Sequence, residues 1–476
     1  MLTPEDFTLS ARFTALEKRV ELQAAEINEL KTKLLERDEL LALRDAEIVE
    51  LKSKLNKNSS NSSKPPSKDS PNFDRNQTRR GKTKKKVGGQ KGHTGSTLEM
   101  VDNPDEISIH NPPVVCDGCG AVTHGLATEV ISRHQEFDIP SPPPPLVTEH
   151  RVLGCTCGKC GRKLRGQLPD GVSSAPTSYG KRICGYVAYL SVRHYLPYAR
   201  LKELILDLFG TSVSTGTLVN MIARKAKDCE PTVQLIKKAI SGSEVVAADE
   251  TFAREAGRRV ILWIWCTLQY VYLVRGPNRA YEVVEREWPN GFPTSTLTSD
   301  RWSPQLKTPA AANQICAHHL LRECRGLEQR ENATPWIEIM MALLKDIVTF
   351  GALGRSCYKT TYEPLEADLD ELLDDKWIEH EYLPKGELKF YKGLKKQREK
   401  LTTCLYHKNV PPDNDDAERG VRGAKVKMNV SSQWRSQSGT QQYCTIRSVI
   451  ATAIRQGLRP LDILMGTKTL NFSQST

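Results

Sequence analysis

Apolar residues recur at a seven-residue spacing along the first 56 residues of the chain. Counting in sevens gives only apolar positions, namely Phe13, Val20, Ile27, Leu34, Leu41, Ile48 and Leu55. A second row, three residues further on, mixes apolar and polar positions, namely Leu16, Leu30 and Leu51 with Gln23, Arg37 and Arg44. This heptad pattern predicts a coiled coil over 9–56, and the charged second row favours a dimer. The alternative is a single amphipathic helix that folds back on the rest of the chain.

Short apolar runs bounded by Gly, Pro and Asn predict β-strands further along the chain. Three such runs cover 245–248, 260–266 and 270–274, and two further short strands, less apolar in sequence, are predicted at 296–299 and 314–317. The run 260–266 is apolar on both faces, which predicts a strand inside a sheet that is covered on both sides. Helical patterns follow the third run and the fifth run.

Acidic residues stand at the ends of two of these runs, Asp249 after the first and Asp300 after the fourth. Such a carboxylate needs a cation, a hydrogen-bond network or a metal to compensate its charge. After a stretch of helical patterns at 331–408, Asn414 is predicted to cap a helix that carries Glu418. The predicted order is three strands, a helix, a fourth strand and a late helix. The acids lie on the first strand, the fourth strand and the late helix, which is the layout of an RNase H-like nucleotidyl transferase.

Neighbouring residues offer alternatives to these three acids. Glu250 adjoins Asp249, but the two-residue period of a strand points it to the opposite face. Asp415 and Asp416 remain open as replacements for Glu418, or as acids that a helix dipole favours in its first turn. His318 and His319 diverge on their helix, so we expect a buried or DNA-facing histidine rather than a metal-binding pair.

The charge of the chain favours a polyanionic partner. The formal net charge is +11, and residues 419–460 hold eight Lys or Arg and no acid. A basic surface beside a carboxylate is expected where a nucleic acid passes a metal site. The predicted DNA contacts of this surface are Arg419, Arg422, Lys425, Lys427 and Arg435.

Residues 57–96 are a basic linker that is predicted to be disordered, because it has too few apolar residues to fold alone. Its cationic side chains suit salt-dependent contacts with phosphates, and a plain solvated spacer is the alternative. The predicted DNA contacts in this linker are Arg79, Arg80, Lys82, Lys84, Lys85 and Lys86.

Two C-x-x-C-G motifs predict a structural zinc site within residues 100–175. The ligands would be Cys116 and Cys119 from the first motif and Cys157 and Cys160 from the second, because each spacing lets two thiolates of one turn reach a single ion. Cys155 competes with Cys157 as a ligand. A hairpin of 133–139 and 146–152, with Pro142–Pro145 at its turn, is expected to bring the two motifs together.

A helix-turn-helix pattern lies within residues 177–240. A helical run at 201–208 ends at Phe209-Gly210, and Ser214 is a predicted N-cap of a second helix that carries Arg224 and Lys225. This arrangement suits a DNA-reading unit in which Arg224 and Lys225 contact DNA. A pair of ordinary core helices is the alternative.

These motifs, taken in order, resemble transposases of the insertion-sequence-66 family over most of the chain. The resemblance rests on Lys57–Pro66, Gly88–His93, the two Cys motifs, Asp249-Glu250-Thr251, Ser299-Asp300-Arg301, Cys316–Arg322, Asp413-Asn414, Ala417-Glu418-Arg419, Lys425-Val426-Lys427, Arg435-Ser436, Gly439 and Ile446-Arg447-Ser448. The chain departs from the family's pattern at Phe252, where a Gly is common, and at Ser431-Ser432, where Ser-Gly is usual.

The resemblance implies a DDE catalytic triad of Asp249, Asp300 and Glu418. In such a site two magnesium ions, with manganese as a substitute, are held by the three carboxylates and activate an in-line displacement at phosphorus. It also implies cleavage and transfer of double-stranded DNA, both at insertion-sequence ends and at a target, with accessory proteins of the same element. The alternatives are a decayed or domesticated copy that only binds DNA, and a resolvase or RNase H enzyme of the same fold.

Together these features predict a multidomain α+β protein. It would combine an N-terminal coiled coil, a small zinc-ribbon-like module, a helical helix-turn-helix region and an RNase H-like α/β catalytic core with an all-α insertion. The core is expected at 243–330 and 409–460, the insertion at 331–408 and a tail at 461–476. Without a signal peptide or an apolar run of about 18 residues, the chain is expected to be cytoplasmic and nucleoid-associated in a bacterium.

Overall fold

The computed structural model describes residues 4–58, 61, 92, 95, 97–353, 359–378, 382–407 and 409–472. It contains two compact units. The larger comprises Met1–Pro71, Glu149–Leu206 and Ser212–Thr476, and the smaller comprises Asn72–Thr148 with Asp207–Thr211. In this described part of the chain, every helix is too short or too polar to cross a membrane.

The basic linker side chains that we predicted to contact DNA lie outside the described residues. They are Arg79, Arg80, Lys82, Lys84, Lys85 and Lys86.

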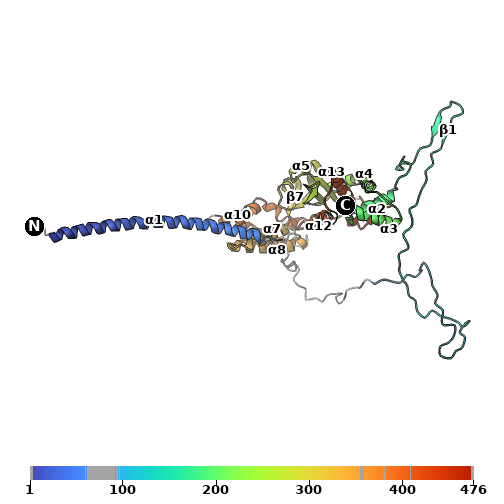
Figure 1. Ribbon diagram of the computed structural model, residues 1–476, viewed down its shortest axis with the longest axis horizontal. Helices are drawn as coiled ribbons and strands as arrows, with labels where there is room; N and C mark the ends of the chain where they lie inside the picture. Colours follow the sequence, from blue (N-terminus) through green and yellow to red (C-terminus); the bar gives the residue numbers. More distant parts are fainter. Residues whose placement is uncertain are drawn as a thin grey trace. The chain divides into compact units, whose positions relative to one another are not determined.

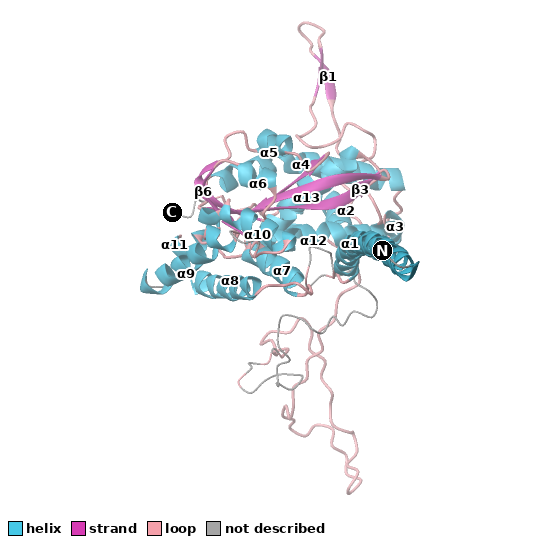
Figure 2. Cartoon of the chain, turned by 90° about the vertical axis from the view of Figure 1, so that its left-hand side faces the viewer, coloured by secondary structure: helices cyan, strands magenta, loops and turns pink. Residues whose placement is uncertain are grey.

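A five-stranded sheet forms the centre of the larger unit (Figure 2). Its strands are β3 (Val245–Glu255), β4 (Arg258–Cys266), β5 (Val271–Gly276), β6 (Phe292–Ser299) and β7 (Ala310–Ile315), in the order β5-β4-β3-β6-β7. The first three pair antiparallel, whereas β6 runs parallel to β3 and β7 runs parallel to β6. Four of the five predicted strands are therefore confirmed, and the fifth, predicted at 314–317, begins and ends earlier, at Ala310 and Ile315, because Ala317 already belongs to the next helix.

Strand β3 is longer than its apolar run, so our expectation that it ends at Asp249 is wrong. Residues 249–255 continue the strand because they pair with 258–264 of β4. The neighbouring strand supplies the backbone hydrogen bonds that a polar sequence needs to stay extended. Asp249 thus lies in the middle of a strand.

Both faces of β4 are covered, as its sequence predicted. Trp263 and Trp265 stack on one face with ring centroids 5.9 Å apart, and Trp265 also packs against Trp288. Ile264 points to the other face and is buried under helix α12 (Asp415–Ser431). A strand buried on both sides fixes the positions of its neighbours because dense packing leaves little room for shifts.

Helix α13 (Gln437–Arg455) covers the outer edge of the sheet at β5. The hydroxyls of Ser448 and Thr452 accept hydrogen bonds from the backbone N–H groups of Leu273 and Val271, at 2.8 and 3.0 Å. These bonds satisfy donors that an edge strand would otherwise leave exposed. The predicted C-terminal tail begins in a further helix, α14 (Pro460–Met465), which packs on α2 (Lys181–Val192).

Helices α3 (Tyr198–Phe209) and α4 (Thr215–Ser241) form the predicted helix pair. Ser214 caps α4 as expected, because its hydroxyl accepts a hydrogen bond of 3.0 Å from the N–H of Thr217. However, α4 is 27 residues long and packs against α13 and α2. One side of α4 therefore belongs to the hydrophobic core, and Lys225 lies on this buried side.

The stretch between β7 and α12 contains only helices among its described residues. They are α7 (Ala317–Glu328), α8 (Pro335–Leu353), α9 (Lys359–Leu372), η3 (Asp375–Trp377), α10 (Lys385–Lys395), η4 (Arg398–Lys400) and α11 (Thr403–Tyr406). Two more helices flank β6, namely α5 (Tyr281–Glu287) before it and α6 (Ser303–Lys307) after it. The end of the all-α insertion predicted at 331–408 is thus divided into three short helices, α10, η4 and α11.

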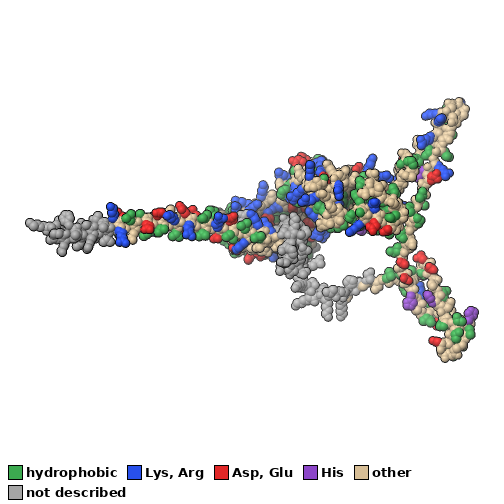
Figure 3. Space-filling model, in the orientation of Figure 1, with side chains coloured by type: hydrophobic (Ala, Val, Ile, Leu, Met, Phe, Trp, Pro, Cys, Tyr) green, Lys and Arg blue, Asp and Glu red, His purple; other side chains and the backbone are tan. Residues whose placement is uncertain are grey.

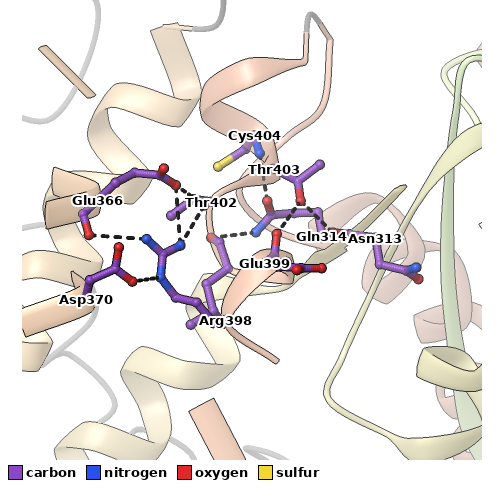
Figure 4. Close-up of polar contacts among 10 residues, drawn as sticks. Asn313, Gln314, Glu366, Asp370, Arg398, Glu399, Thr402, Thr403 and Cys404 are labelled. Carbon is purple, nitrogen blue, oxygen red and sulfur yellow. Dashed lines mark hydrogen bonds and ion pairs between the residues drawn. The ribbon is translucent and has the colours of Figure 1, made fainter. Parts of the chain in front are cut away.

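Polar contacts join this helical stretch to the sheet (Figure 4). On β7, the Gln314 amide accepts a hydrogen bond of 2.7 Å from the N–H of Cys404, and the Thr403 hydroxyl donates to the carbonyl of Asn313 at 2.6 Å. Arg398 reaches α9 and contacts Glu366 and Asp370. These bonds hold the helices that precede α12, and so they help to define where α12 begins.

The predicted hairpin of the zinc module is wrong. Neither 133–139 nor 146–152 forms a strand, because the Pro-rich stretch between them lacks N–H donors for a ladder. A different hairpin surrounds the second Cys motif, where β1 (Gly154–Thr156) pairs antiparallel with β2 (Lys163–Arg165).

Residues 4–55 form one continuous helix, α1 (Pro4–Leu55; Figure 1). Its predicted apolar row is exposed in the single chain, with Ile27 at 52% and Leu34 at 60% exposure. Green apolar side chains alternate with charged ones along the described part of this helix in Figure 3. The alternative of a helix that buries this row against its own chain is therefore wrong for the described side chains.

Gly420 allows α12 to lie directly on the sheet. A Cβ at this position would collide with Cδ1 of the buried Ile264. We therefore expect Gly420→Ala to lower the free energy of unfolding by about 1–3 kcal/mol, as overpacking does. Thermal unfolding followed by near-ultraviolet circular dichroism measures this change.

Gly216→Ala is the matched control for this prediction. It is also a Gly→Ala change within a helix, but its Cβ would meet only Oγ of Ser214 at 3.8 Å. It should leave stability unchanged or raise it by up to about 1 kcal/mol. If Gly420→Ala stabilised the protein as much as Gly216→Ala, the close packing of α12 on β4 would be refuted.

Candidate active site

The strand register places Asp249 and Asp300 side by side. The last paired residues of the parallel strands β3 and β6 are Ala247 and Thr298, and Asp249 and Asp300 each follow two residues later. Adjacent strands lie about 4.8 Å apart, and residues two apart point to the same face. The two predicted acids therefore lie next to each other at the end of β6.

Helix α12 brings Glu418 to the same place. The side-chain amide of Asn414 donates a hydrogen bond of 2.7 Å to the carbonyl of Ala248, the residue before Asp249. Its backbone N–H points at the sulfur of Cys316, at 3.3 Å. Asn414 occupies the N-cap position but makes no side-chain cap bond, so its predicted capping role is wrong. Its side chain instead ties the start of α12 to β3.

The electrostatics of the carboxylates shows that they converge. Burial raises the pKa of Asp249 well above its ordinary value, and the negative charges of Glu250, Asp300 and Glu418 raise it further. Burial likewise raises the pKa of Asp300 to about 6, with Glu250 and Glu418 adding to the effect. The backbone N–H of Trp302 opposes the shift by donating to Asp300 at 3.0 Å.

Glu250 contributes charge to this cluster although we expected it on the opposite face. Its side chain is 2% exposed and forms an ion pair with Arg279. The side-chain amide of Gln305 donates a second hydrogen bond to Glu250, at 3.4 Å. Arg279, which compensates a buried charge beside the two aspartates, was not predicted from the sequence.

Aromatic rings hold the Arg279 guanidinium. Its central carbon lies 4.1 Å from the ring centre of Trp302 and 5.5 Å from that of Phe252. Arg259 stacks on Phe252 as well, at 3.3 Å. Phe252, which departs from the pattern of the resembling family, thus forms part of a cation–π cluster beside the acids.

The two adjacent histidines of α7 each face a carboxylate near the start of α12. Nδ1 of His319 lies 3.5 Å from a carboxylate oxygen of Glu418, and Nδ1 of His318 lies 3.5 Å from one of Asp415. Cys316, His319 and Glu418 also have ligand atoms within 4.8 Å of one another. The signal that sequence analysis overlooked is the position of His319, in the first turn of a helix that directly follows β7.

The two alternative acids of α12 are engaged elsewhere. Asp415 faces His318, and Asp416 pairs with Arg419 at 2.9 Å and with Arg455 at 3.8 Å. By contrast, the charge of Glu418 acts on both Asp249 and Asp300. This arrangement favours Glu418 as the third acid.

The predicted DNA contacts fall into two groups. Arg224, Arg419, Arg422, Lys425 and Arg435 are exposed. Lys225 is 5% exposed and paired with Asp228, so its prediction as a DNA contact is wrong. Lys427 is partly buried and donates to the carbonyl of Ser432 at 2.7 Å, and burial lowers its pKa to about 8. Both lysines are less accessible to DNA than predicted, because α4 packs the side that carries Lys225 against the core and α12 partly buries Lys427.

Each Cys motif forms the same tight turn within its own unit. Cys116 and Cys157 each accept a hydrogen bond of 2.9 Å at their carbonyl from the glycine four residues later, and both glycines have positive φ. Backbone N–H groups from the turns lower the pKa of the Cys116 and Cys157 thiols. This geometry favours Cys157 over Cys155, which lies on strand β1.

The residues of both sites fit metal ions by donor chemistry. The carboxylates of Asp249, Asp300 and Glu418, of which the two aspartates have raised pKa values, offer hard oxygen ligands that suit magnesium or manganese. Paired thiols with lowered pKa values in tight turns offer soft ligands that suit zinc.

Two family models match the chain. The model described as Transposase IS66 family matches residues 176–442, which is more than half of the chain. A family of unknown function (DUF6444) matches residues 14–99. No curated protein matches the chain.

The raised pKa of Asp300 generates a prediction about stability. Because the folded protein binds this proton more tightly than the unfolded chain, the free energy of unfolding falls as pH rises from about 4 to above 6. The shift from 3.8 to about 6 corresponds to about 3 kcal/mol at most. In metal-free buffer, Asp300→Asn should therefore raise the melting temperature at pH 8 and have little effect near pH 4.

The exposed Asp368 supplies the control variant for this experiment. Asp368→Asn should not change the melting temperature at either pH. A lower melting temperature of Asp300→Asn at pH 8, measured with a chelator present, would contradict the crowding of charges at this site.

Proposed function

The chain belongs to the Transposase IS66 family, and from this membership we propose that it is a DDE-type transposase. Family membership implies a role in transposition. The finer proposal is metal-dependent cleavage of DNA strands at the ends of an insertion sequence, followed by transfer to a target. Asp249, Asp300 and Glu418 are the proposed catalytic acids, and an RNase H-like core is the proposed fold of the sheet and its helices.

One observation carries this proposal, namely the electrostatic interaction among acids from three separate elements. Beyond the effect of burial, Asp300 from the end of β6 and Glu418 from α12 raise the pKa of Asp249 on β3, and Glu418 also raises the pKa of Asp300. Crowding carboxylates in a partly buried place costs free energy unless a cation is bound there. The strand order β5-β4-β3-β6-β7, with a parallel β6, supports the RNase H-like assignment.

In the proposed mechanism, the three carboxylates hold two magnesium ions. When bound, these ions would supply Lewis-acid activation and neutralise charge at the reacting phosphate. The acids bind metal only when deprotonated, so apparent metal affinity should rise as pH increases through about 6.

The neighbouring residues position the catalytic acids. Arg279 neutralises Glu250, so that this fourth carboxylate adds less charge at the site. His319 lies against Glu418 and limits the orientations of its carboxylate. This mechanism requires no covalent intermediate on the protein.

The remaining modules are proposed to bind DNA and a second copy of the chain. We assign DNA contacts to the exposed cations Arg224, Arg419, Arg422, Lys425 and Arg435, and we assign pairing between copies to the exposed heptad row of α1. Such a row is stable when it is buried in a coiled-coil seam. Structural zinc is proposed to be bound by Cys116, Cys119, Cys157 and Cys160.

The catalytic proposal predicts metal-dependent cleavage of a duplex that carries the element's end. Wild type should nick this duplex with magnesium and not with chelator. Asp249→Asn should lower the nicking rate by at least about 100-fold, because loss of a ligand exceeds the 10–100-fold effect of losing a partner of a ligand. The measurement is the rate of product formation on a denaturing gel.

Asp368→Asn serves again as the matched exposed control and should nick at the wild-type rate. Equal nicking by wild type and Asp249→Asn would remove Asp249 from catalysis. If the wild-type protein bound the element's end tightly but never nicked it, this result would favour the alternative of a decayed copy that only binds DNA.

The zinc proposal predicts about one zinc ion per chain, measured by inductively coupled plasma mass spectrometry. Cys119→Ser and Cys157→Ser should each lower the zinc content to near zero, because a site of four thiolates loses most of its affinity with one ligand. Cys155→Ser should retain zinc, since Cys155 lies on β1 and outside the turn. Zinc loss in Cys155→Ser with retention in Cys157→Ser would reverse this assignment.

A further inference from the structure

A groove of about 590 Å³ leads away from Asp300. Helix α7, helix α10 and the end of α1 supply most of its lining, and Trp302 and His319 lie beside Asp300 at one part of it. The groove has the volume of a small-ligand pocket. It therefore suits a short stretch of one strand rather than a duplex.

Cations outnumber acids along this groove. The lining includes the cationic residues Lys52, Lys57, Arg301, Arg322, Arg330 and Lys389. The acids are Asp300, Glu323 and Glu331, of which Glu323 pairs with Arg301 and Glu331 pairs with Lys52. The net charge of the lining is thus positive, apart from the acid cluster at Asp300.

Two glycines of α10 let guanidinium groups lie against its backbone. A Cβ at Gly386 would collide with Nη1 of Arg330, and one at Gly393 would lie 2.9 Å from Nη1 of Arg301. Among the described residues, Nε of Arg330 and Nε of Arg322 have no hydrogen-bond partner. Both Nε atoms are buried, but each side chain as a whole is only partly buried, and a partly exposed guanidinium group on a groove wall is suited to bind phosphate oxygens.

The end of α1 forms the third wall through a set of residues that we call the α1 clasp, comprising Asn56, Lys57, Asn58 and Asn61. The side chain of Asn61 accepts from the N–H of Asn58 at 2.8 Å and donates to the carbonyl of Asn56 at 3.0 Å. These bonds close a turn after the helix.

Asn61 also fastens this turn to the end of α7. Its side-chain amide donates to Gln329 at 2.6 Å. Its backbone carbonyl oxygen lies so close to Gly326 that a Cβ at that position would be only 2.5 Å from it. The α1 clasp therefore needs a glycine at position 326. This docking places Lys57 in the lining of the groove.

We propose that this groove binds a single DNA strand next to the phosphodiester at the acids, and that the α1 clasp is one of its walls. Cations that contact phosphates, together with an aromatic ring on which a base stacks, are the features of single-strand sites. The groove offers both, because Trp302 lines it and is 39% exposed. The clasp lies within residues 14–99, the segment matched by the family of unknown function. The proposal gives this segment of the chain a role in substrate binding.

This inference rests on the proposed function for its choice of DNA, but its test does not need catalysis. The probe is a fluorescein-labelled single strand of twelve thymidines, with binding followed by anisotropy in chelator at several salt concentrations. The full chain is used, so that the basic linker contributes equally in every variant.

Arg322→Gln combined with Arg330→Gln should weaken binding by about 10-fold or more. It should also reduce the slope of log affinity against log salt by about 1.4, which is 0.7 for each lost phosphate contact. Arg325→Gln is the matched control, since Arg325 lies on α7 but outside the groove. It should bind like wild type.

Two further variants keep the test independent of folding. Lys389 is exposed, so Lys389→Gln should flatten the salt slope by about 0.7 without lowering the melting temperature. Gly326→Ala should displace the α1 clasp and weaken binding of the strand while Arg322 and Arg330 stay intact. Its effect tests the clasp separately from the guanidinium groups.

Unchanged affinity and salt slope in both Arg322→Gln/Arg330→Gln and Lys389→Gln would overturn the groove as a strand site, even if Asp249-dependent nicking were observed. Wild-type binding by Gly326→Ala would overturn the role of the clasp. Conversely, groove-dependent binding by a protein that shows no nicking would support this inference and refute the proposed catalysis.

Discussion

The repulsion among buried carboxylates is the constraint on which the rest of this structure depends. Asp249 and Asp300 are placed together by the parallel register of β3 and β6, and α12 adds Glu418. Burial raises the pKa of Asp249 and of Asp300, and the charge of Glu418 raises both further, so the metal-free folded protein carries an unfavourable energy at this point. Under the proposed function, a bound cation would offset that cost, and clustered groups with perturbed pKa values are typical of functional sites.

The surrounding packing keeps the acids from moving apart. Gly420 lets α12 lie on Ile264, and Asn414 joins the start of α12 to the backbone of β3. On the other face, the stacked Trp263 and Trp265 fix β4 beside β3. Arg279 then offsets the charge of Glu250, the one additional acid in the cluster. Rigid packing and local charge balance together define the geometry that proposed metal binding needs.

The helices outside the sheet connect this site to the rest of the larger unit. The contacts of Gln314 and Arg398 hold the helical stretch that leads into α12. The end of α1 reaches the end of α7 through Asn61, so a helix with an exposed apolar row ends at the groove that Asp300 also lines. If two copies pair along that row, the same helix that joins them would also form part of each strand groove.

The sequence by itself predicted most of the elements of the larger unit, and it named Asp249, Asp300 and Glu418, which remain the proposed catalytic acids. Apolar runs predicted five strands, heptad spacing predicted α1, and Ser214 was identified as a cap, because these signals depend on neighbours along the chain. Tertiary structure alone decided the length of β3, the pairing of Asn414 with Ala248, and the burial of Lys225. It also decided that Glu250, Arg279 and His319 belong to the site. These features arise from contacts between segments far apart in sequence, and local spacing carries no information about which distant partner a side chain will meet.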